Sequence, residues 1–197
     1  MVQTSCDDAE LVVRTCRGDN DAFAELVARY QDYMHNTIGH MVGFGQDAED
    51  LTQEVFLKAY RGLGGFRRRA QFSTWLYGIM LNCVRSYWRH KGRRPNVVSL
   101  DRSAGEDGDD PAPDPPSPTD GPDGEVERSE NVAMIRAAIG RLPEELREIV
   151  VMRDLQGMSY EDLALTLDLP LGTVKSRLAR ARSALKDAVA PLLGGGL

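Results

Sequence analysis

A stretch that interleaves aromatic residues with cations carries the clearest chemical signal in this sequence. Residues 55–100 contain ten basic side chains and no acidic one. Within this stretch, helical spacing places on one face the residues Trp75, Asn82, Arg85 and Arg89, continued by Trp88 and Lys91. Unstacked bases require flat π faces, and their phosphates require positive charge. This face is therefore predicted to bind single-stranded nucleic acid.

The helix that positions this face is predicted to begin at Ser73, whose hydroxyl can cap its first turn. Its other side has an apolar stripe at helical spacing, made of Leu76, Ile79, Met80, Cys83, Val84 and Tyr87. The stripe makes Cys83 a core residue rather than a nucleophile. Each aromatic residue of the basic face, taken alone, is better explained as a core anchor. The acid-free length of the whole stretch favours nucleic acid.

A second candidate for nucleic-acid binding lies near the C-terminus, where two short helical segments flank a tight turn at 168–172. Ser159 with Asp162 suits the start of the first helix. The second is predicted from the apolar stripe Val174, Leu178, Ala181 and Leu185. Its opposite side is centred on Ser176, Ala179, Arg180 and Ser183, flanked by Lys175, Arg177 and Arg182. Such a helix-turn-helix fits a major groove, although an ordinary solvated helix would share the pattern.

A third helix, predicted to start at Asp47, offers an acidic surface. Its buried stripe is expected to be Ala48, Leu51, Val55 and Ala59. Its other faces carry Asp47, Asp50, Gln53, Glu54 and Phe56. An acidic surface with an exposed apolar residue indicates a protein partner with basic groups. Asp47 and Asp50 would equally suit a helix start that needs only capping and dipole residues.

Charge and composition divide the chain into segments. The net charge of −6 is the sum of segments of opposite charge. Residues 1–54 hold 3 basic and 11 acidic side chains and residues 101–130 hold 2 and 11, whereas residues 55–100 hold only basic ones. Residues 101–124 contain six of the ten prolines and no aromatic residue, which predicts a flexible linker. We expect an all-α protein of two small helical domains, residues 10–98 and 127–193, joined by a disordered acidic linker over residues 99–126.

The sequence argues against several classes of protein. No apolar run is long enough for a membrane-spanning helix, and the N-terminus has no secretory signal. The three cysteines form no Cys-x-x-Cys pair, so neither a disulfide framework nor a zinc site is expected. A nuclease built on Asp47, Glu49 and Asp50 would lack a nearby histidine ligand. We expect no catalytic residue, metal or cofactor, and a cytoplasmic protein without membrane insertion.

The sequence resembles extracytoplasmic-function (ECF) RNA polymerase sigma factors, of the sigma-70 family, at three motifs. These are the runs Asp47–Phe56, Phe72–Tyr77 and Gly172–Arg177, within a resemblance that covers roughly residues 20–95 and 130–190. The resemblance implies a two-domain helical protein that binds core RNA polymerase and directs it to promoter DNA. It also implies an anti-sigma factor as a partner. The alternative, a conventional helix-turn-helix regulator with a sensory N-terminus, explains only the C-terminal half.

The resemblance further implies three sets of site residues. Sigma region 2.2, which docks on the polymerase, corresponds to a helix with contacts from Asp47, Asp50, Leu51, Gln53, Glu54 and Phe56. Regions 2.3 and 2.4, which capture the melted −10 strand, correspond to Arg67, Arg68, Arg69, Gln71, Phe72, Ser73, Trp75, Asn82, Arg85, Trp88, Arg89 and Lys91. Region 4.2, which reads the −35 element as duplex, corresponds to Thr173, Lys175, Ser176, Arg177, Ala179, Arg180 and Arg182.

Two positions depart from the family pattern, and the linker has a possible role of its own. Asp168 stands where the turn commonly has glycine; aspartate tolerates the left-handed conformation, so the turn is expected to survive. Ala179 stands where relatives often carry a larger side chain facing DNA. In the family, the linker threads the nucleic-acid channels of the polymerase, so its acids can mimic nucleic acid there. A passive tether is the simpler alternative.

Overall fold

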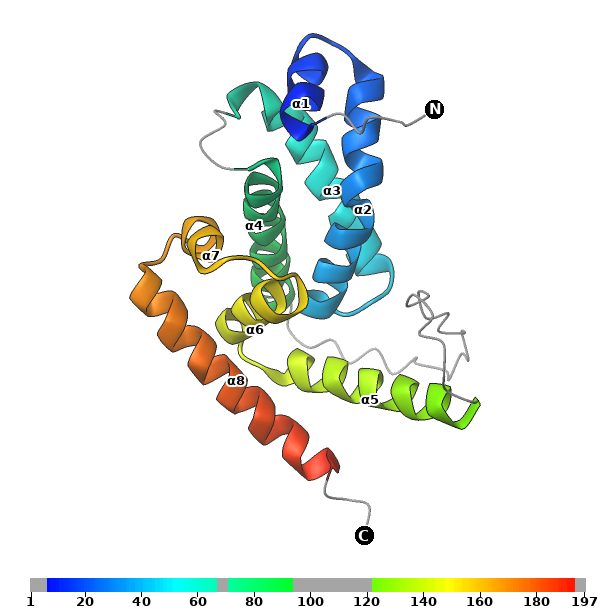
Figure 1. The fold of residues 1–197 in the computed structure, drawn as a ribbon, viewed down its shortest axis with the longest axis vertical. Helices are drawn as coiled ribbons and strands as arrows, with labels where there is room; N and C mark the ends of the chain where they lie inside the picture. Colours follow the sequence, from blue (N-terminus) through cyan, green and yellow to red (C-terminus); the bar gives the residue numbers. More distant parts are fainter. Residues whose placement is uncertain (1–6, 67–70, 94–121, 194–197) are drawn as a thin grey trace.

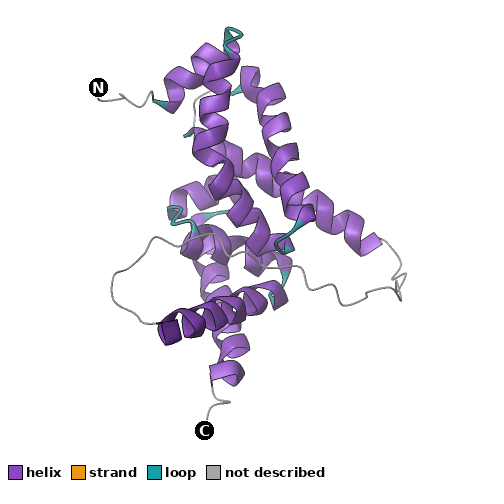
Figure 2. Ribbon diagram, turned by 90° about the vertical axis from the view of Figure 1, so that its right-hand side faces the viewer, coloured by secondary structure: helices purple, strands orange, loops and turns teal. Residues whose placement is uncertain are grey.

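The computed structural model describes residues 7–66, 71–93 and 122–193, and every regular element among them is helical (Figures 1 and 2). The first group of helices comprises α1 (Asp8–Cys16), α2 (Asn20–Val42), α3 (Gln46–Gly62), the 3-10 turn Leu63–Gly65 and α4 (Phe72–Arg93). The second comprises α5 (Pro122–Arg141), α6 (Glu144–Val150), the π-helical turn Val151–Leu155, α7 (Tyr160–Leu167) and α8 (Leu171–Leu193). The prediction of an all-α fold is confirmed.

The helix carrying the basic face starts one residue earlier than predicted. α4 begins at Phe72, and the Trp75 amide donates to the Gln71 carbonyl at 3.1 Å. Ser73 thus lies inside the first turn, and the prediction that it caps the helix is wrong. The apolar stripe is confirmed at its centre, where Leu76, Met80, Cys83 and Val84 are at most 1% exposed. Burial raises the pKa of the Cys83 thiol, in keeping with a core residue.

The acidic helix α3 buries more of its surface than its periodicity indicates. The predicted stripe is confirmed, since Ala48, Leu51, Val55 and Ala59 are at most 6% exposed. Phe56, placed by the sequence among the outer residues, is only 8% exposed. It lines a groove between α3 and α2, so α3 packs on two sides rather than one. The placement of Phe56 on an open face is corrected accordingly.

The helix-turn-helix forms as the sequence predicts. The Ser159 hydroxyl accepts a hydrogen bond from the Asp162 amide at 3.0 Å and so caps α7. Asp168 ends α7 in the left-handed conformation, with φ 54° and ψ 52°. The Leu169 amide donates back to the Ala164 carbonyl at 3.0 Å, which closes the helix before α8 begins.

The left-handed residue makes the turn sensitive to substitution. Replacing Asp168 with valine is expected to lower the free energy of unfolding by about 1–2 kcal/mol, because a β-branched side chain crowds the backbone at positive φ. Replacing it with glycine should leave stability unchanged or raise it by less than about 1 kcal/mol. Urea unfolding followed by circular dichroism measures both. Equal stabilities of the valine and glycine variants would contradict this account of the turn.

The two groups of helices pack against each other. α7 lies beside α4, and α6 lies against one end of α2 (Figure 1). Their buried apolar side chains form one contiguous cluster that runs from Leu11 in α1 to Ala181 in α8. Most of the predicted linker, residues 99–121, lies outside the described residues, whereas residues 122–126 belong to α5. Among the described residues, the two groups of helices therefore share one core, and α4 lies where the two groups meet.

Candidate nucleic-acid and protein interfaces

Aromatic rings gather where the basic loop meets α4. The ring of Phe66, just before the loop, lies 6.1 Å from that of Phe72, just after it. Trp75 packs on both, at 5.1 Å from Phe66 and 5.8 Å from Phe72, and Tyr30 of α2 contacts Phe72 at 5.4 Å. Phe72 is 4% exposed, whereas Phe66, Trp75 and Tyr30 are half-buried and keep part of their rings open to solvent. The predicted contacts Arg67, Arg68 and Arg69 lie outside the described residues.

Further along α4, the predicted DNA-binding residues divide into open and occupied ones. Asn82 and Arg89 are exposed. Arg85, in contrast, donates from Nε and Nη2 to the two carboxylate oxygens of Glu148 in α6, at 2.7 and 2.6 Å. Trp88 is 9% exposed and lies under the guanidinium of Arg147, 5.5 Å from its ring centre. Helical spacing placed these residues on one face, but it could not show which of them contact side chains of other helices.

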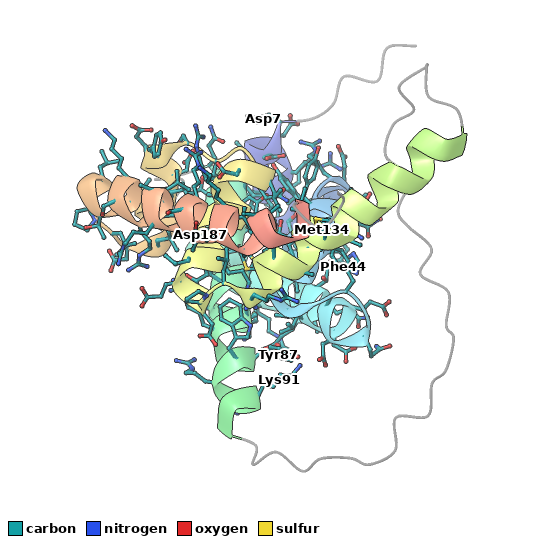
Figure 3. The ribbon with its side chains drawn as sticks, turned by 90° about the horizontal axis from the view of Figure 1, so that it is seen from below. Asp7, Phe44, Tyr87, Lys91, Met134 and Asp187 are labelled. Carbon is teal, nitrogen blue, oxygen red and sulfur yellow. The ribbon has the colours of Figure 1, made fainter. Side chains whose placement is uncertain are left out.

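The last exposed turn of α4 is tied to the start of α3. Lys91 Nζ donates to the Tyr87 hydroxyl at 2.6 Å, and that hydroxyl donates to Asp47 Oδ2 at 2.5 Å. Tyr87 and Lys91 project together from α4 at one edge of the molecule (Figure 3). Burial, and then the hydrogen bond to Asp47, raises the pKa of Tyr87, so the hydroxyl stays protonated at neutral pH. Asp47 and Lys91 are both more than half exposed, so their attraction contributes little to stability.

The outer face of α8 matches the geometry predicted for a recognition helix. Val174, Leu178 and Ala181 are at most 2% exposed and hold the helix on α6 and α7. The opposite side is exposed and consists of Lys175, Ser176, Ala179, Arg180 and Ser183. Small side chains at its centre leave room for base edges, and cations beside them suit phosphates.

The cations around this face are not equally available. Arg182 donates from Nε and Nη2 to Asp154 at 2.9 and 2.5 Å, and Arg177 is 3.3 Å from Glu145 with its side chain 16% exposed. Among the described residues, Lys175 and Arg180 have no such acidic partner. Thr173 is half-buried, and its carbonyl accepts a hydrogen bond from the Ser176 hydroxyl at 3.1 Å.

A groove of about 400 Å³ runs between α2 and α3 beside the acidic residues. Its lining is mainly apolar and includes Phe23, Val27, Phe56, Leu57 and Tyr60 together with Gln53. Leu57 is 57% exposed and Tyr60 is 47% exposed, which is unusual for large apolar side chains. The sequence analysis did not identify either residue. The two are three positions apart and lie outside the buried stripe, and this helical spacing could have indicated a second apolar face on α3. Asp47, Asp50, Gln53 and Glu54 are exposed as predicted, whereas Leu51 is buried.

The described residues offer little for other kinds of chemistry. No cluster of three or more His, Cys, Asp or Glu side chains suited to a metal ion occurs among them. In the same part of the chain, no helix combines the length and the apolar character that crossing a membrane requires.

Two family models match the two groups of helices. The model for sigma-70 region 2 matches residues 26–94, and the model for sigma-70 region 4 matches residues 133–185. The chain is 40% identical over 192 residues to the RNA polymerase sigma-H factor of Pseudomonas aeruginosa, covering 96% of this chain and 97% of that protein. It is 37% identical over 193 residues to the ECF RNA polymerase sigma-E factor of Escherichia coli K12, covering 94% and 96%.

A solved structure shares the arrangement of most of the chain. CnrH, determined in complex with the cytosolic domain of CnrY, superposes with a TM-score of 0.68 and 25% identity, covering 93% of this chain and 97% of that one. Sequence and fold therefore agree, and the chain belongs to the ECF sigma factors of the sigma-70 family.

Proposed function

We propose that this sigma factor binds core RNA polymerase and directs it to promoters by reading the −35 element as duplex and capturing the melted −10 strand. The observation that carries the proposal is the pairing of two surfaces in one chain. One is the exposed face of α8, which has small residues between cations, and the other is the aromatic and basic face of α4. A conventional helix-turn-helix regulator needs only the first of these surfaces.

The assignment of α8 to the −35 element rests on its exposed side chains. Lys175 and Arg180 flank Ser176 and Ala179 and have no acidic partner among the described residues. A major groove admits a helix of this kind, with its cations at the phosphates and its small side chains near the bases. Ala179 contributes no hydrogen bond to a base, so we expect Ser176 and Arg180 to supply most of the sequence discrimination.

The assignment of α4 to the −10 strand rests on energetic arguments as well as on exposure. Flipping a base out of the duplex costs a few kcal/mol, and stacking on an aromatic side chain returns about 1–3 kcal/mol. One captured base is therefore close to neutral, and phosphate contacts must favour the open state. Arg89 is exposed on the same face as Asn82 and is the described arginine best placed to supply such a contact.

Replacing Arg89 with alanine is expected to reduce open-complex formation on duplex promoter about fivefold, by removing one phosphate contact. The loss should shrink on a template that is already melted at −10, because strand capture then no longer has to offset base unstacking. Potassium permanganate reactivity of the −10 thymines measures opening. Arg17→Ala, an exposed arginine outside this face, is the control. Equal losses on duplex and premelted templates would contradict the assignment.

The assignment of α3 to the polymerase rests on the groove beside it. Exposed Leu57 and Tyr60, together with Phe23, form an apolar surface in the groove, and the acidic residues of α3 border it. A helix with one apolar edge and basic neighbours would fit this surface. CnrH was solved in complex with the cytosolic domain of CnrY, which supports a further protein partner for this chain. The resemblance to ECF sigma factors implies that this partner is an anti-sigma factor.

Transcription with purified components tests the function as a whole. Core RNA polymerase alone starts poorly on intact linear DNA, and we expect addition of the chain to give discrete transcripts from promoters. A helix-turn-helix regulator would bind DNA without conferring initiation on core polymerase. Absence of new transcripts with active core polymerase would contradict the proposal.

A further inference from the structure

The acidic residues of α3 differ in what their side chains contact. Asp50 and Glu54 are bound within α3 itself, to a glutamine one turn before and a lysine one turn after, at 2.9 and 2.6 Å. Asp47 instead reaches α4, where its Oδ2 accepts a hydrogen bond from the Tyr87 hydroxyl. Among the described acids of α3, Asp47 alone hydrogen-bonds to the helix assigned to the −10 strand.

Asp47, Tyr87 and Lys91 form a hydrogen-bond network with a defined direction, here called the Tyr87 network. Lys91 Nζ donates to the Tyr87 hydroxyl at 2.6 Å, and that hydroxyl donates to Asp47 Oδ2 at 2.5 Å. Because Asp47 takes the hydroxyl proton, the lone pairs of the Tyr87 oxygen are turned toward Lys91. Asp47 thus orients the hydroxyl, and the hydroxyl orients the ammonium group.

The ammonium group of this network stays open to solvent. The Lys91 side chain is 62% exposed and projects with Tyr87 from one edge of the molecule (Figure 3). The hydrogen bond to Tyr87 raises the pKa of Lys91, so the group is charged at neutral pH. An ammonium has three donors, and Asp47 Oδ2 is 3.6 Å away, beyond hydrogen-bond distance. Lys91 therefore keeps donors for a phosphate while its position is fixed by Tyr87.

We infer that Asp47 is a positioning residue for strand binding, which acts through Tyr87 to hold Lys91 in place for a phosphate of the −10 strand. The inference rests on the proposed function of α4. It moves Asp47, which the family resemblance places among the polymerase contacts, to the DNA side of the chain. Tyr87, expected from its spacing to belong to the apolar stripe, becomes the link between the acid and the cation.

Two effects of Asp47 on a phosphate bound by Lys91 oppose each other. The carboxylate repels the phosphate, but at about 6 Å, screened by water and salt, this repulsion changes the affinity by only about twofold. Holding a long side chain in its bound position in advance is worth roughly 2- to 13-fold in affinity. Positioning is the larger effect. Removal of Asp47 should therefore weaken strand binding, although it also removes a negative charge.

Binding of the full-length chain to a mixed-sequence single-stranded DNA 20-mer tests the inference. We expect Asp47→Asn and Tyr87→Phe each to weaken binding about threefold, because each breaks the Tyr87 network. Lys91→Ala should weaken binding about fivefold, and it should reduce the slope of log K against log salt by about 0.7, through loss of one phosphate contact. Fluorescence anisotropy of the labelled 20-mer over a range of salt concentrations gives both quantities.

Glu49→Gln is the matched control, because it removes the same charge two residues along α3. Glu49 is exposed and has no hydrogen bond or ion pair to α4 among the described residues. We expect Glu49→Gln to leave strand binding unchanged or to tighten it by less than about twofold. Opposite directions for the two variants separate positioning from a general effect of charge. Strand binding by Asp47→Asn as tight as that of the parent, or tighter, would overturn the inference.

A double-mutant cycle distinguishes positioning from a change in the fold. In a Lys91→Ala background, Asp47→Asn should weaken strand binding no further, because no ammonium group remains to be positioned. A purely structural role of Asp47 would give the same loss in both backgrounds. A threefold loss that persists in the Lys91→Ala background would therefore overturn the inference.

Affinity for core RNA polymerase tests the other half of the reassignment. Asp50 is exposed one turn along α3 and stays among the predicted polymerase contacts. We expect Asp47→Asn to lose less core affinity than Asp50→Asn, measured by anisotropy of the labelled chain. A larger loss at Asp47 than at Asp50 would return Asp47 to the polymerase side and overturn the inference.

The Lys91→Ala chain separates failure of the inference from failure of the proposed function. If Lys91→Ala binds the single strand as the parent does, this end of α4 makes no strand contact, and the inference fails together with that part of the proposed function. If Lys91→Ala weakens binding while Asp47→Asn and Tyr87→Phe do not, the strand-binding role of α4 stands and the positioning role of Asp47 is overturned.

Discussion

Replacing Leu57 with glutamate is expected to weaken binding to core RNA polymerase about 100-fold. Leu57 is 57% exposed at the groove between α2 and α3, so the free chain should accept the charge and fold normally. In the complex, the same carboxylate would be removed from water without a partner. Fluorescence anisotropy of the labelled chain, titrated with core polymerase, gives the affinity.

The control for this prediction is Arg17→Glu, which introduces the same residue at an exposed position after α1, outside the groove. Its change in charge is larger, so a general electrostatic effect would appear there first. We expect it to bind core polymerase within about twofold of the parent chain. Equal affinities of the Leu57→Glu and Arg17→Glu chains would show that the groove is not the docking surface.

The second large effect is expected at the outer face of α8. Replacing Arg180 with alanine should reduce transcription from a −35-dependent promoter between about 5- and 100-fold, the usual range for losing one specific arginine contact. Arg180 is exposed without an acidic partner among the described residues, so its full donor capacity is free for DNA. Runoff transcription with the variant holoenzyme measures the loss.

Arg182→Ala is the matched comparison, since it removes the same charge two residues along the same helix. Arg182 is already bound through two hydrogen bonds to Asp154, so DNA gains less from its guanidinium. We expect a loss several-fold smaller than that of Arg180→Ala. A larger loss at Arg182 would mean that DNA displaces Asp154, and the assignment of the contact residues would have to be reversed.

The parts of the fold that depend on local sequence were predictable. The buried stripe of α3, the Ser159 cap and the left-handed turn at Asp168 each follow from residues within a few positions of one another. The all-α class follows in the same way, because helical periodicity continues through both regions. These features need no knowledge of what packs against them.

The parts that depend on distant packing were not predictable. Phe56 is buried because α2 borders it, and helical spacing cannot say how many neighbours a helix has. Arg85 carried the same signal as Arg89 in the sequence, yet only Arg85 meets a buried carboxylate, 63 positions away. Leu57 and Tyr60 became candidate contact residues once the structure showed that both exposed side chains line a groove.

The uneven charge of the chain fits the division of roles proposed here. The acids of α3 border an apolar groove suited to a protein, whereas the cations of α4 and α8 lie on faces suited to DNA. Glu148 is the exception, since it is an acid of the second region that neutralises a cation of the first. The pair therefore neutralises part of the positive charge on α4 that would otherwise attract promoter DNA.

Mapping transcript starts is the measurement that tests the central claim most directly. Core RNA polymerase would transcribe fragmented genomic DNA with and without the full-length chain, and the 5′ ends of the transcripts would be compared. We predict a limited set of chain-dependent starts that share two upstream sequence elements at constant spacing, and their loss with Arg180→Ala. Starts indistinguishable from those of core polymerase alone would contradict the account.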